Sequence, residues 1–246
     1  MIRRVTSALA VVVAVLALPA TFTRPRAPLA SALPMAPLAA VLPMAPMASA
    51  ALYGCSITVP AAVSVSRPHV QLPASLGSDC AAHYATYASW GVRQASSGTN
   101  DIFIFDRRSH ATNTVYDWEA PGTYYVEPRN SWSNFFELSQ NTRSYVVKFG
   151  SRISVSAARA GRYVTLSAFT SYYSPQLRGY RTWPGAKVLL QSRACPRCAW
   201  KNLRVARTGP QGSVAIRTYA VRSRVYRALS SATPAVWGRT SRGVRR

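Results

Sequence analysis

Acidic residues are scarce in this sequence, and none lies in its last hundred residues. The chain has 246 residues, of which 30 are Lys or Arg and only seven are Asp or Glu. All seven acids lie between Asp79 and Glu137, whereas residues 151–246 hold 19 bases and no acid. Most of the formal net charge of +23 therefore belongs to the C-terminal part, which must carry a positive potential.

Helical periodicity and catalytic motifs are also missing. No stretch of a dozen residues repeats apolar residues with the period of a helix, which argues against a helical fold. The three histidines, His69, His83 and His110, lie in no motif that activates a nucleophile, and no Gly-x-Ser-x-Gly is present. We therefore expect a protein that is not an enzyme, with no catalytic residue and no cofactor.

Metal-ligand spacings are absent as well. Asp101, Asp106, Asp117 and Glu119 could supply oxygen ligands for calcium, but they lack the spacing of an EF-hand loop. Asp117 and Glu119 are expected on one face of a strand, as a paired-carboxylate glycosidase site would need. The Pro121-Gly122 turn that follows favours a solvated strand end instead, so we predict no metal site and no glycosidase site.

The N-terminus has the pattern of an export signal. Arg3 and Arg4 precede an apolar run over residues 5–18, which matches a secretory signal peptide and is too short for a confident membrane span of about 20 residues. Residues 1–20 are therefore predicted to be a signal peptide. An uncleaved signal anchor is the alternative.

Residues 21–52 are rich in Ala, Pro, Leu and Met, and they contain a short repeat. Leu-Pro-Met-Ala-Pro occurs at residues 33–37 and again at residues 42–46. Dense prolines remove backbone donors and oppose both helix and sheet. This segment is therefore predicted to be a disordered tether.

Short runs rich in Val, Ile, Thr and Tyr, separated by turn residues, fill the rest of the chain. The alternation predicts half-buried antiparallel strands over residues 102–105, 123–126, 144–149, 153–156, 163–166, 187–191, 203–207, 214–220 and 225–229. Residues 208–212 are expected to form a hairpin turn. We predict an all-β protein of two tandem immunoglobulin-like β-sandwich domains, at residues 53–150 and 151–246. One larger sandwich or barrel is the alternative.

The second block also resembles a known family. Gly185, Val188, Leu190 and Gln191 form a Gly-x-x-Val-x-Leu-Gln pattern, and it is followed by a Trp-containing segment at 200–203, a Thr-x-x-x-Gly turn at 208–212 and an aromatic-Arg pair at 226–227. Residues 152–242 thus resemble Ig-like modules of secreted proteins from high-GC Gram-positive bacteria. The resemblance implies a fold and an extracytoplasmic setting but no activity. The Cys-Pro-Arg-Cys segment at 195–198 departs from it.

The four cysteines predict two disulfides in an exported chain. Local pairing joins Cys55 to Cys80 and, across a hairpin, Cys195 to Cys198, although four cysteines allow three pairings. A thiol-redox role for Cys195 and Cys198 would need a helix after the first cysteine, and residues 199–207 are strand-like instead. One Cys-x-x-Cys supplies only two of the four ligands of a structural zinc site.

The strongest functional signal is the acid-free basic block. The candidate binding residues are Arg217, Arg222, Arg224, Arg227, Arg239 and Arg242. A positive surface attracts polymers that carry phosphate or carboxylate groups, through Coulomb attraction and counterion release. The simplest alternative is that these arginines only keep the domain soluble.

We therefore expect a secreted or extracellular, cell-envelope-associated binding or adhesion module. The expected partners are an anionic cell-wall polymer or acidic glycan, or another extracellular protein. Specific nucleic-acid binding is not expected, because no nucleic-acid-binding module is recognisable. Membrane contact is expected only through an uncleaved signal segment. Two alternatives stay open: a secreted enzyme, either a hydrolase or a thiol-redox protein using Cys195 and Cys198, and an inhibitor or effector that binds a protein.

Overall fold

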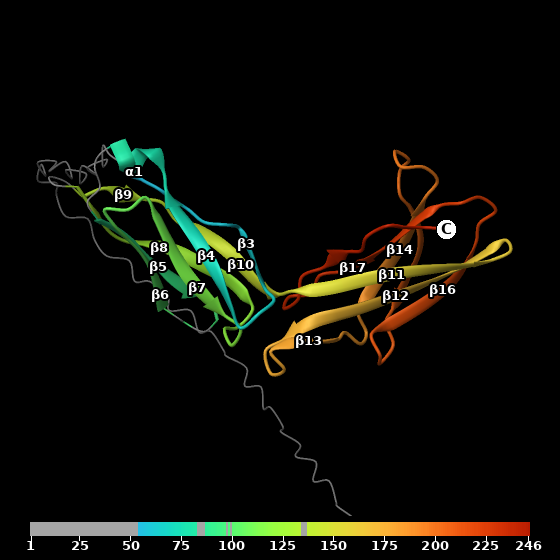
Figure 1. Ribbon diagram of the computed structural model, residues 1–246. Helices are drawn as coiled ribbons and strands as arrows, with labels where there is room; N and C mark the ends of the chain where they lie inside the picture. Colours follow the sequence, from blue (N-terminus) through green and yellow to red (C-terminus); the bar gives the residue numbers. More distant parts are fainter. Residues whose placement is uncertain (1–53, 83–86, 97, 99, 134–136) are drawn as a thin grey trace, which may run out of the picture. The chain divides into compact units, whose positions relative to one another are not determined.

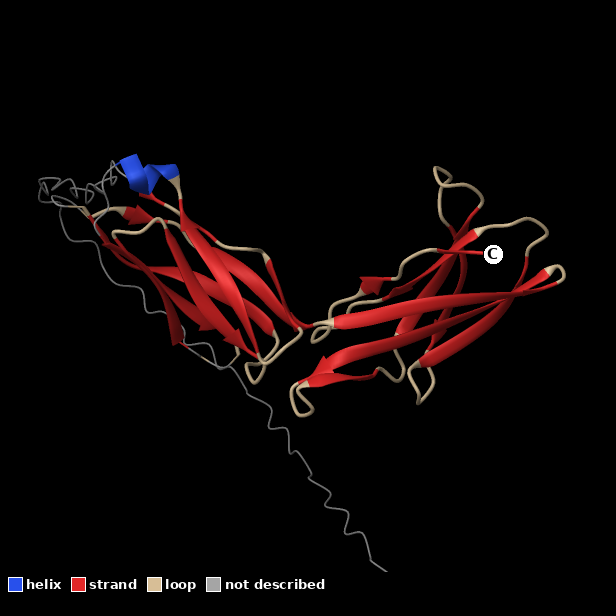
Figure 2. Ribbon diagram, in the orientation of Figure 1, coloured by secondary structure: helices blue, strands red, loops and turns tan. Residues whose placement is uncertain are grey.

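The computed structural model describes residues 54–246 except 83–86, 97, 99 and 134–136 (Figure 1). The predicted signal peptide and the whole predicted tether, together with residue 53, lie outside the described residues. Residues 49–246 form one compact unit. Its described secondary structure is all strand apart from α1 (Ser78–Ala82), as Figure 2 shows. The all-β prediction is therefore confirmed.

The first block folds into two facing sheets. One sheet has three strands, β2 (Ile57–Thr58), β4 (His69–Leu76) and β7 (His110–Tyr116). The other has five, in the order β3 (Ala62–Val65), β10 (Arg143–Phe149), β8 (Gly122–Trp132), β5 (Tyr87–Gln94) and β6 (Asn100–Asp106). Alternate side chains of both sheets, among them Leu72, Trp90 and Phe103, are buried in one apolar core. This is the layered packing of a β-sandwich.

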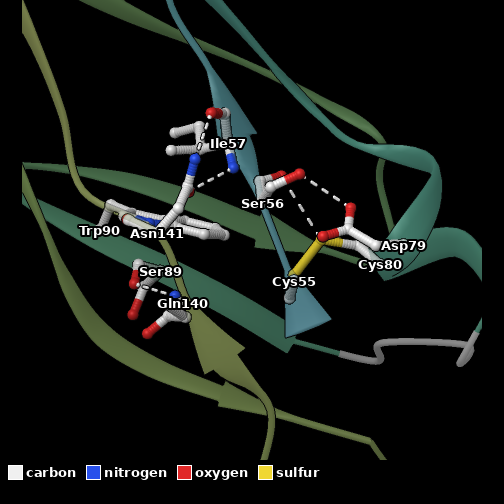
Figure 3. The surroundings of a disulfide bond; sticks show 9 residues. All are labelled: Cys55, Ser56, Ile57, Asp79, Cys80, Ser89, Trp90, Gln140 and Asn141. Atoms are coloured by element: carbon white, nitrogen blue, oxygen red, sulfur yellow. Dashed lines mark hydrogen bonds between the residues drawn. A yellow bond between two sulfur atoms is a disulfide. The ribbon is translucent and has the colours of Figure 1, made fainter. Parts of the chain in front are cut away.

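The start of this sandwich is tied down by the first disulfide (Figure 3). Cys55 of β1 (Gly54–Cys55) is bonded to Cys80 of α1, while β1 pairs with β9 (Ser139–Gln140). Asn141 accepts a hydrogen bond from the backbone N–H of Ile57 at 2.8 Å and donates one to its carbonyl at 3.2 Å. The indole N–H of Trp90 donates to the Asn141 carbonyl at 2.9 Å. These bonds connect the disulfide end to the core.

The second block forms two further sheets. In one, β12 (Tyr163–Ser174) pairs with β11 (Ser151–Ala160) on one side and with β16 (Ser213–Tyr219) and β13 (Gly179–Thr182) on the other. The second sheet holds β15 (Lys201–Arg207), β14 (Lys187–Arg193), β17 (Val225–Ser230), β18 (Arg239–Thr240) and β19 (Val244–Arg245). Val164, Leu166, Val188, Leu190 and Tyr226 are fully buried in a second apolar core. The chain returns from β15 to the first sheet at β16, which is a Greek-key crossing of the immunoglobulin-like type.

Both blocks are therefore immunoglobulin-like sandwiches, as predicted. The division near Gly150 falls between the end of β10 and the start of β11. It stays a prediction, because residues 49–246 form one compact unit and Tyr173 of β12 is buried among residues of the first core.

Three details of the sequence prediction were wrong. The sheets are not purely antiparallel, because β1 pairs with β9 and β3 with β10 in parallel. Residues 208–212 do not close a hairpin, because β15 pairs with β14 whereas β16 pairs with β12. Asp117 and Glu119 lie beyond the end of β7 rather than on a strand face, and Asp117 is buried, where it accepts a hydrogen bond from the Tyr173 hydroxyl at 2.8 Å.

Candidate anion-binding surface

The six predicted binding arginines lie in several places on the second sandwich. Arg217 is on β16, and Arg227 is on β17 in the opposite sheet. Arg222 and Arg224 are in the loop that joins these strands, Arg239 is on β18, and Arg242 lies between β18 and β19. Arg224 and Arg227 are half-buried and the other four are exposed. The structure therefore does not place all six on one face.

One group of arginines converges at one end of the second sandwich, and we call it the arginine end. Its members come from three chain segments: Arg159 and Arg162 beside the β11–β12 turn, Arg222 and Arg224 in the β16–β17 loop, and Arg246 after β19. Their backbones are joined by mutual hydrogen bonds between Arg224 and Arg246, at 2.8 and 3.0 Å, and by a bond from the Ala220 N–H to the Arg162 carbonyl.

The guanidinium of Arg159 fastens this end together. It donates to the carbonyls of Ala220 at 2.6 Å, Arg222 at 3.1 Å and Arg246 at 3.3 Å. In the described structure, the side chains of Arg162, Arg222 and Arg224 form no hydrogen bond. Arg159 therefore has a structural role, while these three guanidiniums are available to a ligand.

No acidic side chain neutralises the charge of the arginine end. Residues 151–246 contain no acid, and the one ion pair among the described residues, Arg93 with Glu127, belongs to the first sandwich. The pKa of the buried Tyr226 is raised by burial, and the positive charges of the nearby Arg159 and Arg224 oppose this rise. The end therefore presents a positive potential.

A second group surrounds Trp200, just before β15, and we call it the Trp200 cluster. The guanidinium carbon of Arg227 lies 4.0 Å from the Trp200 ring centroid, and that of Arg193 lies 4.5 Å from it. Gln191 pairs with Arg227 on one side and with Asn202 on the other, next to a β-bulge in β14. Its amide accepts a hydrogen bond from Arg227 Nε at 2.8 Å and donates one to Asn202 Oδ1 at 2.7 Å.

A further cation lies on the opposite sheet. The guanidinium carbon of Arg217 is 4.1 Å from the Tyr163 ring centroid, and Tyr163 packs edge-on against Tyr219 at 5.6 Å. Arg217 is therefore separate from the Trp200 cluster.

The sequence prediction missed Arg159, Arg162 and Arg193, which lie far from the predicted group along the chain. The sequence could have indicated that Arg159 and Arg162 lie close together. They stand on either side of Gly161, a residue typical of a tight turn, and such a turn holds its two sides together.

The structure contains the expected local disulfides, Cys55–Cys80 and Cys195–Cys198. The second lies in the loop between β14 and β15, and Arg193 donates to the Pro196 carbonyl in that loop at 2.6 Å. No helix follows Cys195, so its sulfur lacks the helix N-terminus that stabilises a thioredoxin-type thiolate.

In the described part of the chain, no three His, Cys, Asp or Glu side chains come together as metal ligands. No described helix has the length and apolar character needed to cross a bilayer.

No protein-family model matches this chain, and no curated protein matches its sequence. Among solved structures, the chicken interferon gamma receptor alpha chain is 8% identical over 77% of this chain and 95% of its own, with a TM-score of 0.41. A cytokine receptor from a complex is 10% identical over 77% and 94%, with a TM-score of 0.42. The D0–D1 domain of intimin is 13% identical over 78% and 96%, with a TM-score of 0.26. At such values these proteins say nothing about the ligand of this chain.

Proposed function

We propose that this chain is a secreted, non-enzymatic binding module whose second sandwich adheres reversibly to anionic polymers of a cell envelope. The observation that carries the proposal is the arginine end, where five arginines from three chain segments converge without an acidic side chain. Two disulfides support an oxidising location outside the cytoplasm. The predicted signal peptide at 1–20 and the resemblance of residues 152–242 to modules of high-GC Gram-positive bacteria fit the same setting.

The physics favours a polymer over a single small ligand. Each guanidinium that meets a phosphate or carboxylate releases condensed counterions from a polyanion, so binding strengthens with the number of contacts and weakens with salt. The loop arginines Arg222 and Arg224 are exposed and half-buried, so a repeating ligand can reach them from solvent. Wall polymers with phosphate groups and acidic glycans have this chemistry.

The test is a titration of the full chain with a phosphate polymer of defined length across a salt series. Replacing Arg162, Arg222 and Arg224 with Gln should lower the slope of log K against log salt by about 2, because three phosphate contacts are lost. A matched control replaces Arg67, Arg108 and Arg129 with Gln, which removes the same charge from exposed positions of the first sandwich. The control should leave the slope unchanged.

Two results would contradict the proposal. One is the absence of binding at low salt, which would make the charge a matter of composition and direct the search to a protein partner. The other is an equal loss of binding in both triple variants, which would show that only net charge matters and that the arginine end is not a site.

A further inference from the structure

The Trp200 cluster holds two cations against one aromatic ring, and neither is paired with a carboxylate of the described residues. The guanidinium carbons of Arg193 and Arg227 lie 4.5 Å and 4.0 Å from one ring centroid, so their separation cannot exceed the sum of those distances. The face of an aromatic ring attracts a cation, but it carries no net charge to offset the repulsion between two of them. No carboxylate of the described residues forms an ion pair with either guanidinium.

Both guanidiniums are fixed in position before any ligand arrives. Arg227 Nε is bonded to Gln191, which is held in turn by Asn202. One terminal nitrogen of Arg193 is bonded to the Pro196 carbonyl inside the loop that the Cys195–Cys198 disulfide closes. Little side-chain entropy remains to be lost when these groups bind a ligand, which favours affinity.

Donor capacity is left over in this arrangement. Arg193 Nε is buried and has no hydrogen-bond partner within the described structure. Both terminal nitrogens of Arg227 and one of Arg193 form no hydrogen bond with the described residues. An anion that met the free terminal nitrogens would supply acceptor oxygens and the missing negative charge together.

We propose that Arg193 and Arg227, held by Trp200, form a binding site for a single tetrahedral oxyanion, a phosphate or sulfate group. Planar guanidiniums suit such a group because both terminal nitrogens of Arg227 can donate to two of its oxygens and the free terminal nitrogen of Arg193 to another. The site is separate from the arginine end. It rests on the proposed function only in that the oxyanion would be one unit of the bound polymer.

The experiment uses the full chain labelled with 5-fluorotryptophan. Six tryptophans give six ¹⁹F resonances, and the one lost in Trp200→Phe belongs to Trp200. Inorganic phosphate and sulfate are titrated at constant ionic strength, with chloride as the reference anion. The Trp200 resonance should shift to saturation with phosphate or sulfate and should stay unchanged with chloride.

Charge-conserving variants test the geometry. Arg227→Lys and Arg193→Lys keep the positive charge but lose the fork, so each should weaken phosphate binding about tenfold. Arg217→Lys is the matched control, because Arg217 also stacks on an aromatic ring but on the opposite sheet. Unchanged resonances of the other five tryptophans show that a variant is folded, and either Lys variant alone suffices for the test.

The proposal is overturned if the Trp200 resonance responds equally to chloride and phosphate, or if both Lys variants bind phosphate as the parent chain does. Its failure is distinguishable from that of the proposed function. Polymer binding that depends on the arginine end, without a phosphate shift at Trp200, removes the oxyanion site alone. A saturable Trp200 shift in a chain that binds no polymer keeps the site and removes the polymer function.

Discussion

Thr208 offers a sharp test of how the second sandwich is held together. Its side chain is buried, and its hydroxyl accepts a hydrogen bond from the Ala186 N–H at 2.9 Å and donates one to the Trp183 carbonyl at 2.6 Å. Thr208→Val keeps the shape and removes both bonds. The Trp183 carbonyl still accepts a bond from Thr170, but the buried Ala186 N–H loses the hydroxyl as its acceptor.

The expected cost of Thr208→Val is about 2 to 4 kcal/mol, from one buried donor without a partner and one lost hydrogen bond. The matched control, Thr208→Ser, keeps the hydroxyl and should cost only about 1 kcal/mol for the lost methyl group. Urea unfolding gives both free energies, and hydrogen exchange at the Ala186 amide locates the effect. A Val variant as stable as the Ser variant would refute the reasoning.

Three further predictions concern the backbone, a carboxyl group and the disulfides. Gly212→Ala should destabilise more than Gly161→Ala in urea unfolding: both have positive φ and should incur about 1 to 2 kcal/mol of strain, but only at Gly212 would the new Cβ lie 2.6 Å from a backbone oxygen. Burial raises the pKa of the Glu119 carboxyl group, so the protonated group stabilises the fold below its ordinary pKa, and this stabilisation is lost as pH rises through the raised value. Glu119→Gln should therefore remove this loss from the free energy of unfolding measured between pH 4 and 7. A variant with the pH profile of the parent chain would contradict the prediction. Replacing both cysteines of the Cys55–Cys80 pair, 25 residues apart, by alanine should lower the free energy of unfolding by about 3 to 4 kcal/mol. The same replacement of Cys195 and Cys198, three residues apart, should lower it by about 1 to 2 kcal/mol. Equal losses of stability in urea unfolding would count against loop entropy as the cause.

The strands of the second sandwich were more predictable than those of the first. In β11 and β12 the apolar residues alternate with polar ones over residues 153–157 and 164–168, because one face packs on the core. In the first sandwich, β4 contains Pro73 and β5 contains Gly91, two residues that usually mark the end of a strand. Both strands were missed, since their place in the sheet comes from packing against distant neighbours.

The local sequence pattern did not predict which strands pair with each other. The sequence at 208–212 has the composition of a hairpin turn, and it does form a tight turn in which the Gly212 N–H donates to the Gly209 carbonyl. Whether the strands on either side pair with each other depends on which sheet offers each strand an apolar face to cover. Here β16 covers the core from the opposite sheet, which no residue within the turn specifies.

The candidate site was predictable in its charge but not in its grouping. The absence of acids after Glu137 identified the second block as the basic part. Arg193 and Arg227 are 34 residues apart in the sequence, and they meet over Trp200 only because β14 and β17 pair in a register that places Arg227 beside Gln191. Arg217 and Arg227 were predicted in one group of binding residues, whereas the strands that carry them, β16 and β17, belong to opposite sheets.

The second sandwich meets two requirements that usually conflict. Ordered guanidinium groups need acceptors for their N–H donors, and carboxylates, the common acceptors, would also cancel the charge. Here the acceptors are backbone carbonyls, as for Arg159 with Ala220 and Arg246 with Ala157, while aromatic rings hold the guanidiniums of Arg217 and Arg227. A carbonyl oxygen or a ring satisfies or orients a guanidinium without adding negative charge. These four arginines are therefore held by the fold without a carboxylate side chain that would cancel their charge.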